Sequence, residues 1–333
     1  MPRVLVVSLN YRTAEMTLRS VRAALTAMRG LDAELVVVDN ASGDGSAERI
    51  ETALRSEDWA QGAPVRLIRS PVNGGFGAGN NVGIRAGLSD GSRPDYVYLL
   101  NSDAFPEPGA IKALVARLEA HPEAGIAGSR IEGEDGAAHV TAFRFPSLWS
   151  ELEGAARFGL LTRALRDHVV PIGVPETSHP VGWLAGASMM LRQDMLDRIG
   201  AFDETFFLYF EETDLCLRAA RAGWQAHYVV ESRVTHIGSV STGMKRWDRI
   251  PGFWLDSRWH YFCKNHGRAY AAAATVLHAL GGVTWRIRHP LQGKPRTDPP
   301  RFLRGLLIHD LRAALTPRPA PRIQSAIPAA DPE

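Results

Sequence analysis

The sequence predicts an α/β protein with a mixed, mostly parallel sheet flanked by helices. Short apolar segments rich in β-branched residues alternate with segments whose apolar residues recur at helical spacing. Polar residues and glycines directly follow several of these apolar segments. The chain of 333 residues, 45% of them hydrophobic, is long enough to bury a large core. Alternating strands and helices form βαβ units, which build parallel sheets.

The composition narrows the classes of function. Lysine and arginine number 38 against 36 acids, so no global basic field indicates nucleic acid as a partner. The two cysteines, Cys216 and Cys263, give no disulfide framework and no metal-binding spacing, which is compatible with a reducing compartment. The first apolar run, residues 4–9, has no cleavage-site pattern after it and is interpreted as a strand. No run of about 20 apolar residues is present to span a membrane.

The first third of the chain predicts three strands, at residues 4–9, 34–38 and 65–68. Thr13 is expected to cap a first helix that Gly30 ends, and Ser46 a second helix. Asn10 and Tyr11 follow the first strand, and Asp39 follows the second. Ligands of open α/β sheets bind just outside the carboxyl ends of the strands, so these side chains are candidate ligand contacts.

A glycine- and asparagine-rich segment, residues 73–81, follows the third strand and opens a helix through Leu88. Glycines there let backbone amides approach a diphosphate. The spacing does not match the dinucleotide fingerprint, and the segment follows the third strand instead of the first, so an NAD enzyme is poorly supported. A glycine-rich turn without a ligand is the alternative.

Residues 95–106 form the central motif, DYVYLLNSDAFP. A buried strand at 96–100 ends in Asn101, Ser102 and Asp103, and Pro106 is expected to open a helix. Asp103 is therefore either a metal or substrate ligand at a strand end or, like Ser102, a cap of the next helix.

A second polar cluster follows a strand predicted at residues 181–191 and five bulky apolar residues. Burying Glu211 and Glu212 there is costly unless they have a functional role or cap a helix. The next helix is expected at 214–222. The alternatives are capping by Thr213 and Asp214, or acids solvated in the first turn. His236 follows the last strand, at 228–230, in the same topological position.

Residues 1–250 are predicted to form one domain, with a nucleotide-binding half at 1–130 and a second half at 131–250, which the family resemblance given below assigns to the acceptor and to catalysis. Residues 251–316 mix aromatic residues with basic ones, such as Arg258, Arg286 and Arg288, on amphipathic helices. Such helices suit an anionic membrane surface, or they pack on the core with their cations reaching solvent. The Pro/Ala-rich tail, 317–333, is expected to be disordered.

Seven motifs in order resemble the inverting family 2 glycosyltransferases of GT-A fold, particularly the bacterial rhamnosyltransferase-like branch. The motifs read VVSLNY, VVVDNASGDGS, NGGFGAGNNVGI, YLLNSDAFP, WLAGASMMLR, FDETFFLYFEETDLCLRAARAGW and VTHIGSVST, and the resemblance covers roughly residues 3–270. The chain departs from the family pattern in two places. Asn101 replaces the first acid of the DXD motif, and glutamate stands where the base is more often aspartate.

The resemblance implies roles for individual residues. The nucleotide and donor sugar would be bound by Asn10, Tyr11, Asp39, Asn73, Gly74, Gly75, Asn80, Asn81, Asn101 and Ser102. A Mn²⁺ or Mg²⁺ ion would be held by Asp103 and His236. The loop facing the donor sugar and acceptor would include Trp183, Gly186 and Ala187. The general base would be Glu212 or its neighbour Glu211.

The implied activity is transfer of a sugar from a dTDP- or UDP-sugar to a cell-surface glycan or lipid-linked acceptor. Within this branch dTDP-rhamnose is the favoured donor. The expected location is cytoplasmic, peripheral at the inner face of the plasma membrane. A nucleotidyltransferase is an alternative, but it would place a basic, glycine-rich loop where Asn10 to Thr13 stand. A non-catalytic scaffold is another, although it would be expected to lose Asp39, Asp103 and Glu212.

Overall fold

The computed structural model describes residues 1–238, 249–292 and 298–316. Its main sheet has the strand order β3-β2-β1-β4-β10-β6-β11-β5, with β8 paired to β11. The strands are β1 (Arg3–Asn10), β2 (Asp32–Asp39), β3 (Val65–Arg69), β4 (Tyr96–Asn101), β5 (Ala104–Pro106), β6 (Ala124–Glu132), β8 (His179–Val181), β10 (Ser188–Arg192) and β11 (Gln225–His236). A small second sheet pairs β7 (Ala142–Phe143) with β9 (Trp183–Leu184).

The sheet is mixed, as the sequence predicts. Strands β3, β2, β1 and β4 are parallel, and β6 is parallel to β11. Between these two groups lies β10, which is antiparallel to both β4 and β6. The two halves predicted on either side of residue 130 therefore share one continuous sheet.

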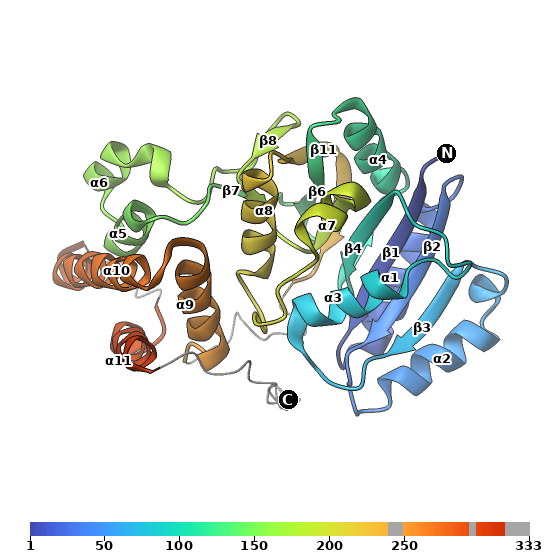
Figure 1. Cartoon of the computed structure of the whole chain (residues 1–333), viewed down its shortest axis with the longest axis horizontal. Coiled ribbons are helices and arrows are strands. Elements are labelled where there is room, and N and C mark those ends of the chain that lie inside the picture. The colour runs from blue at the N-terminus through green and yellow to red at the C-terminus, as the bar shows by residue number, and fades with distance from the viewer. Residues whose placement is uncertain (239–248, 293–297, 317–333) are drawn as a thin grey trace.

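Helices cover both faces of this sheet (Figure 1). One face is covered by α1 (Ala14–Ala27), α2 (Ser46–Ser56) and α4 (Ala110–Ala120). The other is covered by α3 (Gly75–Ala86), α7 (Gln193–Ile199) and α8 (Glu211–Arg221). Because both faces are covered, central strands such as β1 and β2 are continuous apolar runs, and Val4 to Val7 are fully buried.

Several predicted boundaries are wrong. Pro106 does not open a helix but ends β5, and α4 begins after Gly109, which has a φ of +91°. The predicted strand 181–191 is interrupted between β9 and β10. Between β7 and β8 the chain forms two helices, α5 (Leu148–Ala156) and α6 (Gly159–Ala164), which are separate because Arg157 adopts a left-handed conformation between them. Helix α8 begins at Glu211, three residues earlier than predicted.

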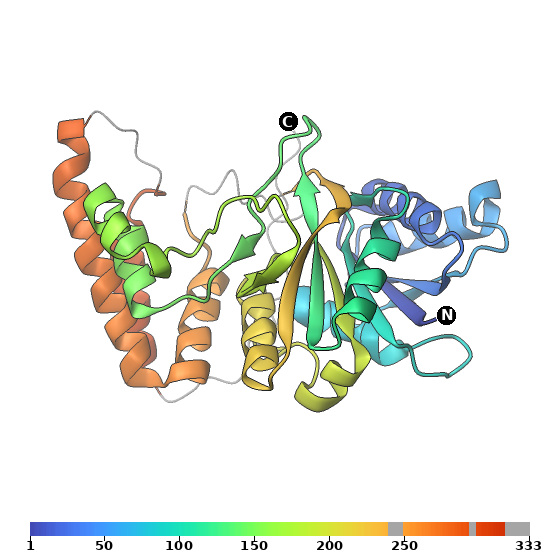
Figure 2. The ribbon, with the colours of Figure 1, turned by 90° about the horizontal axis from the view of Figure 1, so that it is seen from above.

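Residues beyond 250 form α9 (Gly252–His266), α10 (Arg268–Arg288) and α11 (Phe302–Leu315). Helices α5 and α6, from the middle of the chain, lie with them at one end of the molecule, and α5 packs directly on α10 (Figures 1 and 2). Gly281 permits this packing, because a Cβ atom there would lie 2.5 Å from the Leu152 carbonyl oxygen. The group of helices at this end of the molecule thus includes α5 and α6, whose residues the sequence assigned to the catalytic half.

A buried charge cluster holds these helices together. Arg258 on α9 is 1% exposed and lies 2.6 Å from Glu151 on α5 and 3.0 Å from Asp310 on α11. Burial would raise the pKa of Glu151, but Arg258 and His278 lower it to about 2. Arg258 therefore neither faces a membrane nor reaches solvent, contrary to both alternatives that the sequence left open, because its charge is neutralised inside the bundle.

Candidate active site

A cavity of about 410 Å³ lies at the carboxyl ends of the sheet strands, where the sequence predicts ligand contacts. Eleven of the residues implied by the resemblance line it: Tyr11, Asn73, Gly75, Asn101, Ser102, Asp103, Gly186, Ala187, Glu211, Glu212 and His236. The loop between β9 and β10 reaches the cavity because the Asn101 amide donates a hydrogen bond to the Ala187 carbonyl oxygen. Segments distant in sequence thus form one continuous wall.

Asp103 and His236 meet in this wall. Strand β5, which follows Asp103, pairs antiparallel with the end of β11 and sets Ala104 opposite His236. The His236 Nε2 atom consequently lies 3.0 Å from a carboxylate oxygen of Asp103 and 3.5 Å from the Asn101 side-chain amide. Asp103 therefore does not cap α4, which begins seven residues later. The pair offers one carboxylate and one imidazole ligand on the cavity wall.

Asn10 and Asp39 lie behind the cavity lining at the ends of β1 and β2. The Asn10 side chain donates a hydrogen bond of 2.7 Å to Asp39 and accepts one of the same length from Thr17. The Ser42 hydroxyl donates to the same Asp39 oxygen at 2.6 Å. Asn10 is fully buried and Asp39 is 4% exposed, so Asn10 acts as a support that fixes the direction of the Asp39 carboxylate.

The glycine-rich segment packs closely on the loop before α8. Gly75 has a φ of +87°, and a Cβ atom there would lie 1.7 Å from the Phe207 carbonyl oxygen. That same oxygen accepts a hydrogen bond from the Phe76 amide. Asn81 ties α3 to Phe202 through two further hydrogen bonds. The glycine is required here by backbone contact, and Asn81 holds the two segments together.

Gly74 and Asn80 are not among the residues that line the cavity. Gly74 immediately precedes α3, and a Cβ atom there would lie 2.6 Å from that of Ala78. Asn80 is 1% exposed and donates a hydrogen bond to the Phe76 carbonyl oxygen within α3. Both residues therefore shape the first turn of the helix from behind the cavity wall.

Glu211 and Glu212 begin α8 after two residues in the left-handed region, Tyr209 with φ +71° and Phe210 with φ +69°. Such backbone is costly for aromatic residues and is often found where a site must be positioned. Burial, and then the neighbouring Glu212 charge, raise the pKa of Glu211 well above its ordinary value. Burial also raises the pKa of Glu212. One oxygen of each carboxylate is buried without a partner among the described residues.

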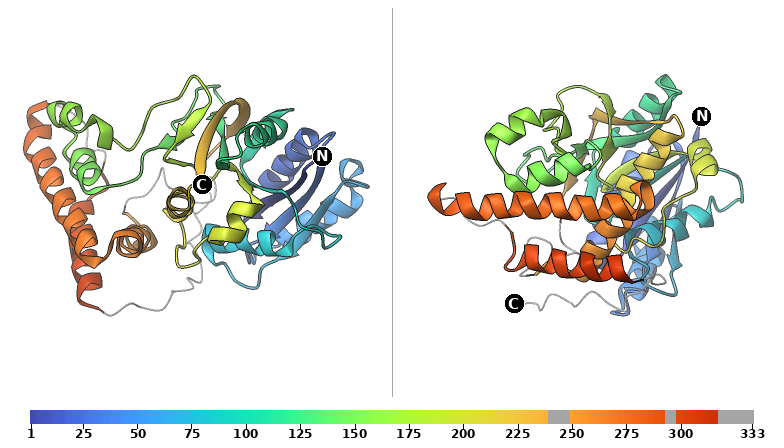
Figure 3. Two further views of the ribbon diagram at one scale, coloured as in Figure 1. Left: turned by 45° about the horizontal axis from the view of Figure 1, so that its top comes forward. Right: turned by 60° about the vertical axis from the view of Figure 1, so that its left-hand side comes forward.

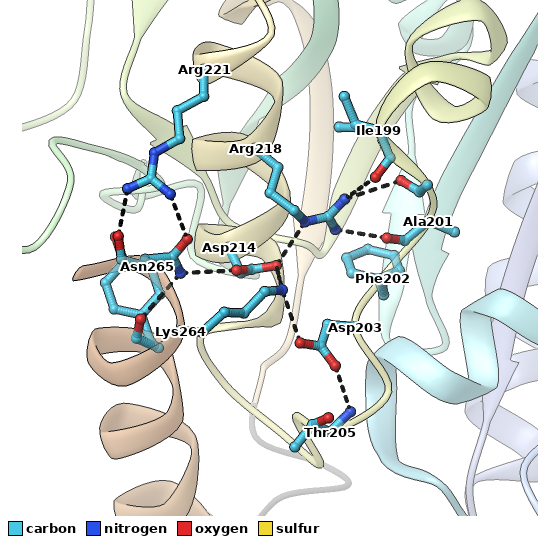
Figure 4. Close-up of polar contacts among 12 residues, drawn as sticks. Ile199, Ala201, Phe202, Asp203, Thr205, Asp214, Arg218, Arg221, Lys264 and Asn265 are labelled. Atoms are coloured by element: carbon cyan, nitrogen blue, oxygen red, sulfur yellow. Dashed lines mark hydrogen bonds and ion pairs between the residues drawn. The ribbon is translucent and has the colours of Figure 1, made fainter. Parts of the chain in front are cut away.

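A polar network anchors α8 behind the two glutamates (Figure 4). Asp214 is fully buried and accepts from Arg218 at 2.9 Å, from Lys264 at 2.7 Å and from Asn265 at 2.9 Å. Lys264 also lies 2.8 Å from Asp203 in the loop before α8. Asp214 therefore connects α8 to α9, and its predicted role as a helix cap is wrong.

A second, mostly apolar cavity of about 350 Å³ lies between the sheet domain and helices α5, α9 and α10. Trp183 and Trp254 line it, and Trp183 stacks on Phe143 with ring centroids 4.2 Å apart. Glu212 and Tyr209 line this cavity as well as the first. Glu212 thus faces two adjoining cavities, whereas Glu211 lines only the first.

Several residues that line the cavities were not predicted from the sequence. Asn40 lines the first cavity, and its side-chain amide donates to Asn73 and to the Gly75 carbonyl oxygen. Its position directly after Asp39 was a signal that could have found it. His139 in the first cavity and Trp254 in the second come from segments whose proximity to the site depends on tertiary packing.

Elsewhere in the described residues, His121, Glu123 and His227 have possible metal-ligand atoms within 4.8 Å of one another. This group lies near the amino-terminal ends of β6 and β11, at the opposite edge from the cavity. Arg117 donates a hydrogen bond to His227 at 2.9 Å. Burial, and then the Arg117 charge, lower the pKa of His227 to about 4. A neighbouring guanidinium disfavours a cation at this place.

Two models of known protein families match the chain that forms this site. The model of glycosyl transferase family 2 matches residues 4–177, and that of glycosyl transferase family group 2 matches residues 96–288. The chain belongs to glycosyl transferase family 2. It is therefore a glycosyltransferase, and its relatives include rhamnosyltransferases.

One relative of this family 2 enzyme is the N-acetylglucosaminyl-diphospho-decaprenol L-rhamnosyltransferase of Mycobacterium tuberculosis. It is 31% identical over 225 residues, which cover 63% of this chain and 68% of the relative. Rhamnosyltransferase WbbL of Escherichia coli is 28% identical over 177 residues, covering 49% of this chain and 60% of that protein.

Among solved structures, the fold is similar to mannosyltransferase PcManGT from Pyrobaculum calidifontis, in complex with GDP-Man and Mn²⁺. The TM-score is 0.56 at 15% identity, covering 95% of this chain and 81% of the other. GalNAc-T7 with UDP, GalNAc and Mn²⁺ also has a TM-score of 0.56, at 12% identity, covering 88% of this chain and 55% of the other. The GT-A fold that the sequence predicts is confirmed.

Proposed function

We propose that the enzyme transfers a sugar from a dTDP- or UDP-sugar to a glycan or lipid-linked acceptor and inverts the anomeric centre. The favoured donor is dTDP-rhamnose. The observation that carries the proposal is the position of Glu212 on two adjoining cavities. One cavity contains the donor and metal residues, and the other is apolar and aromatic. A carboxylate between them is placed to take the proton of an acceptor hydroxyl as that hydroxyl attacks the donor.

The donor nucleotide would lie over the ends of β1 and β2. Asn10 and Ser42 fix the orientation of the Asp39 carboxylate, which retains lone pairs for the N3–H of uracil or thymine. Tyr11 lines the cavity at the end of β1. The amino-terminal end of α3, which begins at Gly75, favours a nearby diphosphate. Asn73 is oriented for donor contact by Asn40.

Asp103 and His236 fit a divalent cation. Their ligand atoms are 3.0 Å apart on the cavity wall, and no lysine or arginine is among the described residues that line the cavity. A carboxylate with an imidazole suits Mn²⁺ or Mg²⁺, and the imidazole favours Mn²⁺. When bound, the cation would neutralise the nucleoside diphosphate leaving group. The presence of Mn²⁺ in the two solved relatives supports this proposal.

Glu212 would act as the general base, in agreement with its raised pKa. A base whose pKa is nearer the working pH transfers protons more effectively, and such catalysis contributes roughly 10²–10⁴-fold to the rate. Attack from the face opposite the leaving group inverts the anomeric centre in one displacement. Glu211 lines the same cavity but not the second one, and burial and the Glu212 charge raise its pKa well above its ordinary value, so it would stay protonated beside the base.

The second cavity would receive the acceptor. Sugar rings bind well against aromatic faces, and Trp183 and Trp254 supply two such faces. The name of the mycobacterial relative specifies an N-acetylglucosaminyl-diphospho-lipid, and we propose an acceptor of that chemical class here. Its lipid would place the enzyme at a membrane, for which we propose the cytoplasmic face of the plasma membrane. In this proposal residues 1–250 carry out the transfer, and 251–316 help to close the acceptor cavity.

Calorimetry and product analysis test this proposal. UDP and dTDP should bind more tightly with Mn²⁺ than without it, and dTDP-rhamnose should support transfer to an N-acetylglucosaminyl-diphospho-lipid. Trp254→Ala should raise the KM for the acceptor and leave the KM for the donor unchanged. Trp149→Ala, on the exposed surface of α5, is the matched control. Nucleotide binding that ignores Mn²⁺, or equal acceptor KM values for both variants, would contradict the assignments.

A further inference from the structure

An apolar surface covers the outer side of α10 and α11. On α10, Val276, Leu280, Val283 and Ile287 are between 48% and 67% exposed. Their spacing of four, three and four residues places them on one stripe of the helix. On α11, four aliphatic side chains, Leu307, Ile308, Leu311 and Leu315, are between 39% and 77% exposed. We name these eight side chains the outer face.

The two stripes lie on the same side of the helix pair. Helices α10 and α11 are antiparallel neighbours, since Arg268 at the start of α10 donates to carbonyl groups at the end of α11 (Figure 3). Thr275 of α10 and Asp310 of α11 mark their contact. At about 100° per residue, both apolar stripes lie about 100° round from this contact, turned away from α9 and α5. Together they form one broad face at the end of the molecule.

The exposed charges around this face have one sign. Within the described parts of α10 and α11, the acidic residue is Asp310, which is 2% exposed. The exposed arginines Arg268, Arg286, Arg304 and Arg312 lie on the same two helices. Salt bridges among the described residues do not involve these four side chains. The face therefore combines aliphatic side chains with uncompensated positive charge.

A small basic pocket adjoins the outer face. It has a volume of about 230 Å³, and the described residues that line it include Arg249, Arg301 and Arg304 and no acid. Ile308 belongs both to this pocket and to the outer face. Three guanidinium groups beside the amino-terminal end of α11 suit a phosphate group. An aliphatic surface next to a phosphate-sized basic pocket matches the two chemical parts of a phospholipid.

We propose that the outer face of α10 and α11 binds an anionic phospholipid bilayer, with a lipid phosphate in the pocket formed by Arg249, Arg301 and Arg304. Helices with an apolar stripe and a basic surround lie in the plane of the membrane interface. This mode fits the described helices, none of which is long and apolar enough to cross a bilayer. Aromatic residues of the same helical extension, such as Tyr261 and Trp285, are buried and take no part in this face.

The outer face connects to the second cavity through α9. Trp254 lines that cavity, and its ring packs edge-to-face on Phe302, which lines the basic pocket. A bilayer on the outer face would thus lie one aromatic pair away from the acceptor site, and this consequence alone depends on the proposed function. Lipid binding itself is measured without donor or acceptor, so the two proposals fail separately.

Flotation of the full chain with vesicles tests the inference. Binding should be strong to phosphatidylglycerol-containing vesicles, weaker to pure phosphatidylcholine, and reduced by salt. The triple change Leu280→Asp, Ile287→Asp and Leu311→Asp should lower the partition coefficient at least roughly tenfold, since these side chains could no longer enter the bilayer. Arg301→Ala with Arg304→Ala should lower it roughly twenty-five-fold for anionic vesicles, at roughly fivefold for each arginine.

Two control variants change comparable side chains elsewhere. Val140→Asp alters an exposed aliphatic residue outside the extension, and Arg55→Ala removes an exposed arginine on α2. Both should bind vesicles like the unaltered chain, and circular dichroism should show that every variant is folded. Equal binding by the triple variant and Val140→Asp would overturn the inference.

Three other occupants of the outer face would also overturn the inference. Dimerisation that the triple change abolishes, without vesicle binding, would assign the face to a second copy. Vesicle binding only after deletion of residues 317–333 would assign it to that segment. Binding of inorganic phosphate that requires Arg301 and Arg304, without vesicle binding, would indicate a site for a soluble anion.

Discussion

The Nε2 atom of His236 lies 3.0 Å from the carboxylate of Asp103, although the two residues are 133 positions apart. Pairing of β5 with β11 creates this contact, so the end of one strand carries the imidazole to the carboxylate at the end of another. The pair is the part of the candidate site that most directly connects the fold to the proposed metal.

Asp103→Ala should reduce Mn²⁺-dependent nucleotide binding by at least tenfold, because the remaining imidazole is a single neutral ligand. His236→Ala should have a smaller effect in the same direction, since the charged ligand stays. Calorimetry with dTDP at several Mn²⁺ concentrations measures both. Glu107→Gln, which alters an exposed acid on the same segment, is the control. Unchanged Mn²⁺ dependence in Asp103→Ala would contradict the metal assignment.

Glu212→Gln should lower kcat by roughly 10²–10⁴-fold while dTDP binds within about threefold of normal, because the base acts on the acceptor proton. Glu211→Gln should retain far more activity. Steady-state kinetics paired with calorimetry separates the two effects. Near-normal turnover in Glu212→Gln, with inactivity in Glu211→Gln, would reverse the assignment.

The acid limb of the pH–rate profile should stay in place in Glu211→Gln. The base works when ionised, and its raised pKa places the loss of activity at a higher pH than for an ordinary glutamate. Burial and the Glu212 charge raise the pKa of Glu211 well above its ordinary value, so Glu211 stays protonated while Glu212 ionises, and a glutamine there removes no negative charge. Values of kcat/KM between about pH 5 and 9 give this limb. A limb that moves to lower pH would show that Glu211 ionises before Glu212.

The two glutamates should also make stability depend on pH. Their pKa values are raised in the folded state, so the folded chain binds protons that the unfolded chain has released. The free energy of unfolding should therefore decrease as pH rises above the ordinary glutamate pKa. Glu211→Gln should be more stable than the unaltered chain at pH 8 and nearly equal to it at pH 4. Thermal denaturation at both values measures the difference.

Gly75→Ala should disrupt both stability and activity. The new Cβ would meet the Phe207 carbonyl oxygen and force apart α3 and the loop before α8. Gly43→Ala is the matched control, because Gly43 has a φ of +65° but no atom within 4 Å of the place that a Cβ would take. Gly43→Ala should cost about 1–2 kcal/mol of unfolding free energy from backbone conformation alone. Gly75→Ala should cost about 1–3 kcal/mol more. Urea denaturation compares them.

The sequence predicted much of the fold because its central strands are buried on both faces. Continuous apolar runs such as residues 4–9 and 34–38 have no other plausible environment in a protein of this size. The predicted boundaries of helices and strands were wrong where the backbone conformation of single residues determined them. The left-handed Arg157 divides one amphipathic segment into α5 and α6, and Gly109 lets β5 form before α4 begins. Arginine does not favour the left-handed conformation, so the break at Arg157 has no local signal, whereas the glycine at position 109 favours the positive φ found there.

The sequence likewise pointed to some residues of the candidate site and not to others. Asp103 and Glu212 were identifiable because acids directly after apolar strands or aromatic runs are expensive without a function. The support given by Asn10 to Asp39, and by Asp214 to α8, was not identifiable, because each depends on a partner from another element. Asn265, for example, reaches Asp214 only because α9 packs beside α8.

By itself the sequence determined the alternation of strands and helices and the chemical types of residue at the strand ends, since both are local properties of composition and spacing. The tertiary structure alone decided which of these residues meet. Pairing of β5 with β11 joined Asp103 to His236, and packing of α9 and α5 beside α8 created the cavity on the far side of Glu212. Packing also buried Arg258 and left the aliphatic stripes of α10 and α11 exposed, because helical spacing defines a face but only neighbouring elements determine whether it is covered.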